Sequence, residues 1–197
     1  MSESDAFVRQ QSHLSPTKKA LLEKLMRGKF RANAIQKRQK QGSEPLSFAQ
    51  ERLWFFEQFN PQQPLYNEPT ALRLLGTLNL VALKHSLNEI VQRHEALRTT
   101  FATVEGQPIQ VIAPNLTLGL PTVNLQALPP TEQEVEVQRI ATEEAKRPFN
   151  LVEGPLVRVT LLQLGEAEHI LLLTMHHIIC DRWSFGVLIR EMTALYQ

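Results

Sequence analysis

The feature that most constrains the fold is a pair of apolar runs that lie close together in the chain. The second run, Leu171 to Cys180, carries the adjacent histidines His176 and His177. The first run, Leu156 to Leu164, is separated from it by Gly165 to Glu168, a sequence typical of a tight turn. We predict two strands of one sheet that pair as a hairpin. Since neither run alternates apolar with polar residues, we expect both faces of these strands to be buried.

The histidine pair sets limits on the chemistry of this region. Adjacent side chains on a strand point to opposite faces, so one histidine can face a cleft while the other packs in the layer behind. Two such side chains cannot converge on one ion, and no further His/Cys cluster lies nearby, so we predict no metal site. A Cys180–His177 nucleophile is disfavoured, because an extended chain places the two about 10 Å apart. A histidine on an apolar strand is most often a packed core residue; Asp181, four residues after the doublet, argues instead for a site.

The composition excludes several classes of protein. A single cysteine excludes a disulfide framework and is typical of a reducing compartment, so we predict a cytoplasmic protein. No apolar stretch reaches the roughly 20 residues that a membrane span needs. The chain begins Met1-Ser-Glu-Ser-Asp5 and so lacks the basic start of a secretory signal peptide.

Charge is unevenly distributed along the chain. Residues 1–40 hold ten Lys or Arg and three Asp or Glu residues, a net charge of +7, whereas the remainder holds eleven and seventeen, a net charge of −6. We therefore place a boundary near residues 41–45 and treat residues 1–44 as a basic helical appendage and a candidate docking segment. Its apolar stripe and basic flank form a candidate partner-binding surface that includes Lys18, Lys19, Leu22, Lys24, Met26 and Phe30. The alternative is a solvated helix packed on its own domain; nucleic acid and membrane are not expected as partners.

Helix and strand patterns alternate irregularly through the rest of the chain. Expected helices start at Ser47, which has the spacing of a capping box with Gln50, and at Asn79, Thr131 and Ser184. Expected strands cover residues 68–75, 98–104 and 107–112, and residues 114–130 are irregular with room for one short strand. The helical residues expected to face the core are Leu80, Leu83, Leu87, Ile90, Val91, His94, Val135, Ile140, Ala141, Phe185, Leu188, Met192 and Leu195. This order predicts an α+β (mixed α/β) fold and not a parallel doubly wound sheet.

Three stretches, in this order, resemble the motifs of one family. Ser47 to Trp54 is similar to SxAQxRLW, Arg93 to Phe101 to RHExLRTxF, and His176 to Ser184 to the HHxxxDxxS signature of nonribosomal peptide synthetase condensation domains. These domains belong to the chloramphenicol acetyltransferase-like superfamily. The resemblance covers residues 45–197 and implies the N-terminal lobe of such a domain, a mixed sheet flanked by helices. Because these domains are pseudo-dimers of two lobes, and the chain ends inside a helical pattern, we expect a truncation before the C-terminal lobe and a fragment that is inactive alone.

The resemblance also implies a reaction. An upstream acyl or peptidyl thioester is joined to the amine of a downstream aminoacyl thioester, both carried on phosphopantetheine arms of carrier proteins, with no other cofactor. By resemblance, His177 is the catalytic histidine that faces the substrate tunnel, and His176 is its structural neighbour. An α-amine has an ordinary pKa of about 7.7–8.0, so part of it is already neutral at pH 7. The expected task of His177 is therefore to orient the amine and to take the proton that the attack releases.

Other motif residues receive supporting roles. An isolated buried carboxylate is costly, so we expect Asp181 to pair with Arg98, or failing that with Arg93, and to brace the end of the strand. The alternative is that both arginines cap the end of their own helix. Most members of the family have glycine directly after the aspartate, whereas this chain has Arg182. Arg182 and Trp183 are therefore candidates for the wall of the substrate tunnel, and the departure points to a different substrate arrangement or a silent site.

Two other functions are compatible with the same residues. The chain could be a non-catalytic docking or recruiting module, with Arg182 spoiling the site. It could also belong to an acyltransferase of the same fold that acts on an alcohol or a soluble amine. Separately from these alternatives, the +7 charge and the apolar stripe predict that residues 15–40 recognise another polypeptide, for which the acidic C-terminal tail of an upstream synthetase subunit is the candidate.

Overall fold

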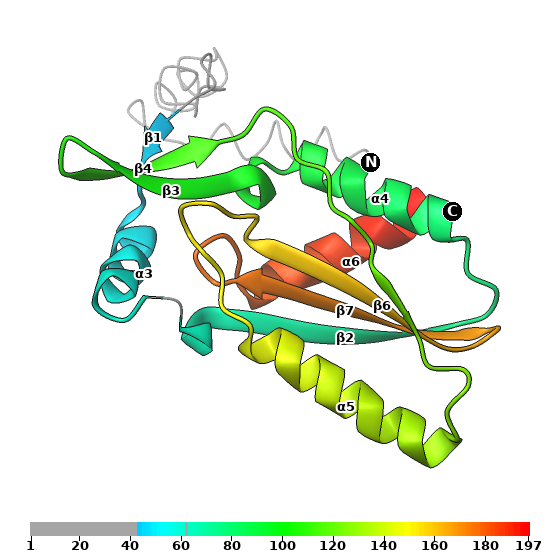
Figure 1. The fold of residues 1–197 in the computed structure, drawn as a ribbon. Helices are drawn as coiled ribbons and strands as arrows, with labels where there is room; N and C mark the ends of the chain where they lie inside the picture. Colours follow the sequence, from blue (N-terminus) through cyan, green and yellow to red (C-terminus); the bar gives the residue numbers. More distant parts are fainter. Residues whose placement is uncertain (1–42, 62) are drawn as a thin grey trace, which may run out of the picture. The chain divides into compact units, whose positions relative to one another are not determined.

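A computed structural model describes residues 43–61 and 63–197 of the chain (Figure 1). The predicted basic appendage, including Lys18, Lys19, Leu22, Lys24, Met26 and Phe30, lies outside these residues, and its role stays a prediction. The same holds for the division of the chain after residue 44. Among the described residues, no helix is both long and apolar enough to cross a membrane.

A four-stranded sheet forms the centre of the described unit, in the order β2-β7-β6-β5. The predicted hairpin is confirmed: β6 (Val157–Gly165) and β7 (Glu168–His176) pair antiparallel around a short turn. Strand β2 (Asn67–Leu75) pairs antiparallel with β7, and β5 (Thr122–Asn124) pairs parallel with β6. The two central strands are buried on both faces, as their unbroken apolar sequences predicted.

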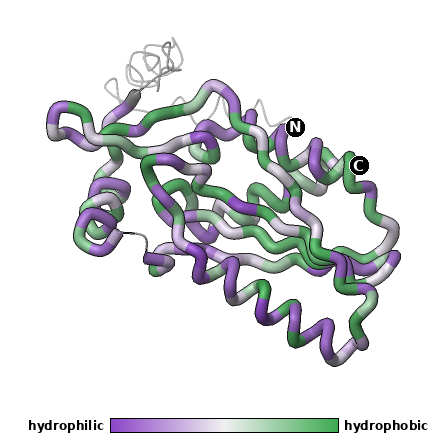
Figure 2. Tube along the Cα trace, viewed as in Figure 1, coloured by the Kyte–Doolittle hydropathy of each residue, from purple (hydrophilic) through white to green (hydrophobic). Residues whose placement is uncertain are grey.

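Helices cover both faces of this sheet. Helices α4 (Leu80–Arg93) and α6 (Arg182–Tyr196) pack on one face, and α5 (Pro130–Lys146) packs on the other (Figure 1). On the α4/α6 side the strands contribute Val157, Val159, Leu161, Leu171, Leu173 and Met175. On the α5 side they contribute Leu162, Ile170 and Leu172. In Figure 2 hydrophobic colouring concentrates on the sheet, whereas α5 alternates hydrophilic and hydrophobic segments, as expected for a helix with one buried face.

A second, three-stranded sheet has the order β1-β4-β3. Strands β3 (Thr99–Val104) and β4 (Gln107–Ile112) form the predicted hairpin. Its two turn residues, Glu105 and Gly106, have φ of 50° and 79°, the left-handed conformation that a two-residue type I′ turn requires. Strand β1 (Ser43–Pro45) pairs with β4. This strand was not predicted, since the sequence near residues 41–45 indicated only a boundary.

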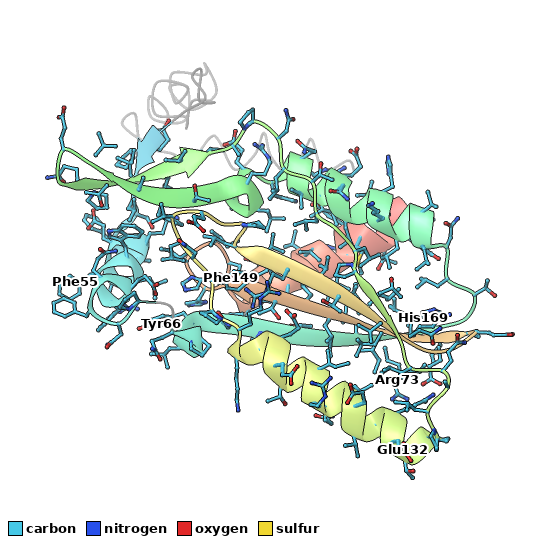
Figure 3. The ribbon with its side chains drawn as sticks, viewed as in Figure 1. Phe55, Tyr66, Arg73, Glu132, Phe149 and His169 are labelled. Atoms are coloured by element: carbon cyan, nitrogen blue, oxygen red, sulfur yellow. The ribbon has the colours of Figure 1, made fainter. Side chains whose placement is uncertain are left out.

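Helix α3 (Phe48–Phe59) begins as predicted. The Ser47 hydroxyl accepts a hydrogen bond from the backbone N–H of Gln50, and the Gln50 side chain accepts one from the Ser47 backbone N–H. A short 3-10 turn, η2 (Pro64–Tyr66), follows α3, and a second, η3 (Glu95–Arg98), follows α4. Leu53 and Trp54 face inward with Phe101, Leu151 and Leu156. Phe55, by contrast, points away from the fold (Figure 3) and is 56% exposed.

Three details of the predicted helices are wrong. Leu80 is 45% exposed, because the inward face of α4 starts one turn later at Leu83. Val135 is 70% exposed, because α5 turns Val137 and its neighbours Ile140 and Ala141 toward the sheet. Two positions along a helix correspond to about 200°, so Val135 faces the opposite side from Val137. The third, the residue that caps the start of α6, belongs to the site described next.

Candidate active site

The end of β7 presents the histidine pair between two neighbouring segments. The backbone N–H of His176 donates to the carbonyl of Leu156 at 3.0 Å, and the backbone N–H of His177 donates to the carbonyl of Tyr66 at 2.8 Å. The strand was predicted to continue to Cys180, but it ends at His176 and a turn follows, closed by a bond from the Ile179 N–H to the His176 carbonyl at 3.0 Å. His176 is thus the last residue of the strand, and the bond to Tyr66 holds His177 directly beside it.

His176 is a packed core residue. It is 2% exposed and its ring lies edge-on against Tyr66 and Phe149, with ring centroids at 6.2 and 6.1 Å. The backbone N–H of Ile178 donates to its Nδ1 at 3.1 Å, so the proton of the neutral ring is on Nε2. Burial, followed by the neighbouring His177, lowers the pKa of His176 to about 4. A neutral ring held in this way is suited to a structural role and not to proton transfer at pH 7.

His177 has the opposite character. Its side chain is 42% exposed, and its Nδ1 lies 3.4 Å from a carboxylate oxygen of Glu68, the second residue of β2. His177 lines an open cavity of about 530 Å³ together with Arg52, Gln110 and Asp181. Of the two histidines, only His177 is therefore accessible to a substrate.

Among the described residues Asp181 pairs with no arginine, and neither Arg98 nor Arg93 binds it, which corrects the prediction. It is exposed and forms the N-cap of α6: its Oδ1 accepts from the backbone N–H of Ser184 at 2.8 Å and from the Ser184 hydroxyl at 2.6 Å. These hydrogen bonds lower the pKa of Asp181, and the nearby His177 contributes further. Ser184 was predicted to be the N-cap but is the third residue of the helix, where its hydroxyl accepts from the Asp181 N–H.

The two arginines bind elsewhere. Arg98 is buried, and its guanidinium donates to the carbonyls of Val91, Gln92, Ala113 and Pro114. It therefore joins the end of α4 to the segment after β4. Arg93 lies 3.0 Å from Glu191 of α6, and the Nε2 of His94 lies 3.0 Å from the same carboxylate. The alternative prediction, that both arginines cap the end of their own helix, is met by Arg98, which binds the carbonyls of Val91 and Gln92 at the end of α4. It is wrong for Arg93, whose side chain pairs with the neighbouring helix α6.

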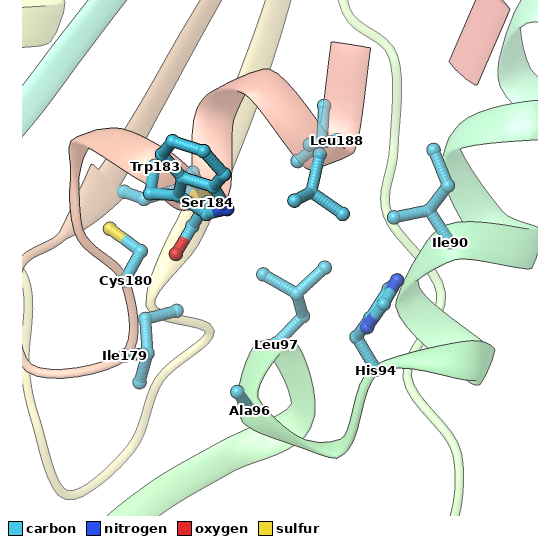
Figure 4. A pocket seen from close by; sticks show the side chains of 11 residues that line it. Ile90, His94, Ala96, Leu97, Ile179, Cys180, Trp183, Ser184 and Leu188 are labelled. Atoms are coloured by element: carbon cyan, nitrogen blue, oxygen red, sulfur yellow. The ribbon is translucent and has the colours of Figure 1, made fainter. Parts of the chain in front are cut away.

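Arg182 and Trp183, predicted to line the substrate tunnel, are both exposed. Arg182 is the first residue of α6, a right-handed helical position that needs no glycine. Trp183 is 80% exposed and forms part of the rim of an apolar pocket of about 170 Å³ between α6 and the α4–η3 corner (Figure 4). Ile179, Cys180 and Ser184 border this pocket and also the cavity that contains His177. The contact of Arg182 and Trp183 with a substrate stays a prediction.

Cys180 is not a candidate nucleophile. Burial, with added repulsion from the carboxylates of Glu68 and Asp181, raises the pKa of its thiol to about 12. Its Sγ lies 3.4 Å from the carbonyl oxygen of His176. Within residues 43–61 and 63–197, no three His, Cys, Asp or Glu side chains are grouped so that they could hold a metal ion.

Two residues that were not predicted as site residues, Gln50 and Glu68, contribute to the site. Gln50 of α3 donates to the carbonyl of Ile178 at 3.3 Å and to the side chain of Gln110 at 3.1 Å, which fixes the turn beside His177. Gln50 belongs to the SxAQxRLW-like stretch, so that motif was an available signal. Glu68 belongs to none of the three motifs, and only the β2–β7 pairing brings it to His177.

Comparison with known proteins is consistent with this arrangement. A family model described as "Condensation domain" matches residues 40–197. The chain belongs to the condensation domain family. It is 47% identical over 156 residues to malpibaldin synthetase of Mortierella alpina, an alignment that covers 78% of this chain and 3% of that protein. It is 41% identical over 186 residues to phosphinothricin tripeptide synthetase PhsC of Streptomyces viridochromogenes, covering 92% of this chain and 17% of that protein. The chain thus spans only a small part of the length of these relatives.

Solved structures confirm the predicted fold class. The starter condensation domain of rhizomide synthetase RzmA superposes with a TM-score of 0.72 at 23% identity, covering 78% of this chain and 37% of that chain. The first condensation domain of the CDA synthetase gives a TM-score of 0.71 at 24% identity, covering 78% and 40%. The described lobe has the condensation domain fold, and the family resemblance read from the three motifs is confirmed.

Proposed function

We propose that this chain is the histidine-bearing lobe of a condensation domain that joins an upstream acyl or peptidyl thioester to the amine of a downstream aminoacyl thioester. The observation that supports this most directly is the accessible ring of His177 at the wall of a cavity, directly after a neighbour that is buried. Membership of the condensation domain family supports the same reaction. The substrates are carried on the phosphopantetheine arms of two carrier proteins, which are the proposed partners.

In the proposed reaction the amine nitrogen attacks the carbonyl carbon of the upstream thioester. A C–N bond forms and the C–S bond breaks. The nitrogen loses one proton and the leaving sulfur gains one, so one thioester and one amine give one amide and one thiol. His177 takes the proton from nitrogen and returns it to sulfur, which leaves the ring as it began.

The demand on His177 is modest, for a chemical reason. The attacking amine has a lone pair whenever it is unprotonated, and a thiolate is a good leaving group, so no strong base has to generate the nucleophile. Orientation of the two reacting groups supplies much of the acceleration. General-base assistance of this type typically contributes roughly 10²- to 10⁴-fold.

The test is a single-turnover condensation assay with two loaded carriers and the full-length protein that contains this chain. We expect His177→Ala to lower the rate about 100-fold. His85→Ala is the matched control: His85 is an exposed histidine on α4, 4.0 Å from Glu89, and its loss should leave the rate unchanged. A His177→Ala protein that condenses at the unsubstituted rate would exclude the proposed role of His177.

A further inference from the structure

The contact between Glu68 and His177 joins two separate parts of the chain. Glu68 Oε1 lies 3.4 Å from His177 Nδ1, with exposed side-chain fractions of 35% and 42%. Backbone hydrogen bonds hold the two residues near each other. Asn67, next to Glu68, lies opposite His176 in the β2–β7 register, and the His177 N–H donates to the carbonyl of Tyr66. The backbones that carry the two side chains are therefore fixed to one another.

The chemistry of this contact restricts the proton on the ring. An ionised carboxylate has only acceptor atoms, whereas each nitrogen of a neutral imidazole is either a donor or an acceptor. An unprotonated Nδ1 facing Glu68 would place two acceptors opposite one another. The favourable arrangement puts the proton on Nδ1 and leaves the lone pair on Nε2.

We propose that Glu68 is the positioning residue of His177: its carboxylate accepts the Nδ1–H of the ring and so leaves Nε2 as the proton acceptor of the reaction. This inference rests on the proposed function only for its effect on turnover, since the tautomer of the ring is a property of the protein itself. The contact is long for a hydrogen bond, and such contacts often shorten when a substrate binds.

The neighbouring histidine provides an internal comparison. Nδ1 of His176 accepts a hydrogen bond from the Ile178 N–H, so its proton lies on Nε2. Nδ1 of His177 faces a carboxylate, so its proton lies on Nδ1. Two adjacent histidines of one turn thus have opposite tautomers, one fixed by a backbone donor and one by a side-chain acceptor.

Nuclear magnetic resonance can observe both tautomers directly. Long-range proton–nitrogen correlation spectra of the chain with ¹⁵N-labelled histidine distinguish a protonated ring nitrogen from an unprotonated one. We expect the neutral form of His177 to be protonated on Nδ1 and that of His176 on Nε2 in the same spectrum. In Glu68→Leu the His177 signals should move toward the Nε2–H form while those of His176 stay unchanged. A wild-type His177 ring protonated on Nε2, or a His177 pattern unaltered by Glu68→Leu, would overturn the proposal.

Kinetics of the full-length protein test the consequence. Glu68→Leu should lower kcat about tenfold with little change in KM for the loaded carriers, because the ring is misoriented while the binding surface is intact. Glu68→Asp, which keeps the carboxylate, should recover part of the loss. Glu168→Leu is the matched control: Glu168 is also on the β2–β7 pair, 2.9 Å from Arg73, but at the opposite end from His177. It should leave kcat unchanged; a loss in Glu168→Leu equal to that in Glu68→Leu would count against positioning.

The two proposals fail in different ways. If the His177 tautomer depends on Glu68 but His177→Ala condenses normally, the positioning is correct and the proposed function of His177 is wrong. If His177→Ala is slow but Glu68→Leu changes neither tautomer nor kcat, His177 acts without Glu68 and the present inference is wrong. If Glu68→Leu does not fold, Glu68→Met, which also removes both carboxylate oxygens at a similar side-chain length, takes its place in the same measurements.

Discussion

The backbone N–H of Ile178 donates a hydrogen bond to Nδ1 of His176 at 3.1 Å. This bond determines what the two histidines can do, because it requires His176 to be neutral with its proton on Nε2, while the same turn carries His177 out to the cavity. A protonated His176 ring would lose this bond and place a charge beside the rings of Tyr66 and Phe149. The doublet is therefore divided between a structural residue and an accessible one.

His176 should make the fold sensitive to acid. Burial lowers its pKa from 6.5 to about 4, so between these values the unfolded chain binds a proton that the folded chain does not. The contribution to the free energy of unfolding is complete above pH 6.5 and decreases as the pH falls toward 4, by at most about 3 kcal/mol. Urea titrations at pH 7.5 and 5.0 measure this loss. In His176→Gln the difference between the two pH values should shrink, whereas an equal difference in both proteins would contradict the assignment.

Asp181 should stabilise the fold as a hydrogen-bond acceptor at the start of α6, and its negative charge should contribute little. Its Oδ1 caps the N-terminus of α6 by accepting from the Ser184 N–H. Asparagine caps a helix about as well as aspartate, so Asp181→Asn should keep the thermal midpoint nearly unchanged, while Asp181→Ala should lower it by a few degrees. Thermal melts monitored by circular dichroism compare the two. If the asparagine and alanine variants are equally destabilised, the cap is not the main role of Asp181.

Cys180 should be nearly inert toward alkylation in the folded protein. With a pKa of about 12, its thiol is ionised to only roughly one part in 10⁴ at pH 8. In the unfolded chain a thiol of ordinary pKa is ionised to about a quarter at that pH. We expect iodoacetamide to react about 1,000 times more slowly with native protein than with protein in urea. Since Cys180 is the only cysteine of the chain, total thiol loss reports on this site alone. Native and unfolded rates within tenfold of each other would contradict the burial of the thiol.

Local patterns in the sequence predicted much of the fold. The β6–β7 hairpin follows from two apolar runs around a short turn, and the start of α3 follows from the Ser47–Gln50 capping box. The phase of α5 was harder, since Val135 and Val137 are equally apolar and only packing on the sheet decides which one is buried. Local signals define an element better than they define the face it buries.

The site was predicted in part, for the same reason. The motifs located His177, whose side chain is exposed, and His176, whose side chain is buried. They did not predict the partner of Asp181, because aspartate and serine are both good N-caps and the turn after β7 decides which of Asp181 and Ser184 takes that place. Glu68 could not be found, since a single glutamate in a strand carries no signal until β2 is paired with β7.

Arg98 should be the more important of the two arginines that the sequence offered as partners of Asp181. Its buried guanidinium donates to four carbonyls at the end of α4 and after β4, and a lysine cannot reproduce that planar arrangement of donors. Arg98→Lys therefore leaves buried carbonyls unpaired and should lower the free energy of unfolding by about 3 kcal/mol, measured by urea titration.

Arg93→Lys is the matched control for this substitution. Arg93 is half-exposed and pairs with Glu191 at 3.0 Å, and exposed ion pairs typically contribute about 0–1 kcal/mol. The control should therefore change the stability little, since lysine keeps the charge that this pair uses. Equal effects of the two substitutions would mean that positive charge, and not the geometry of the Arg98 donors, stabilises the corner that joins α4 to the second sheet.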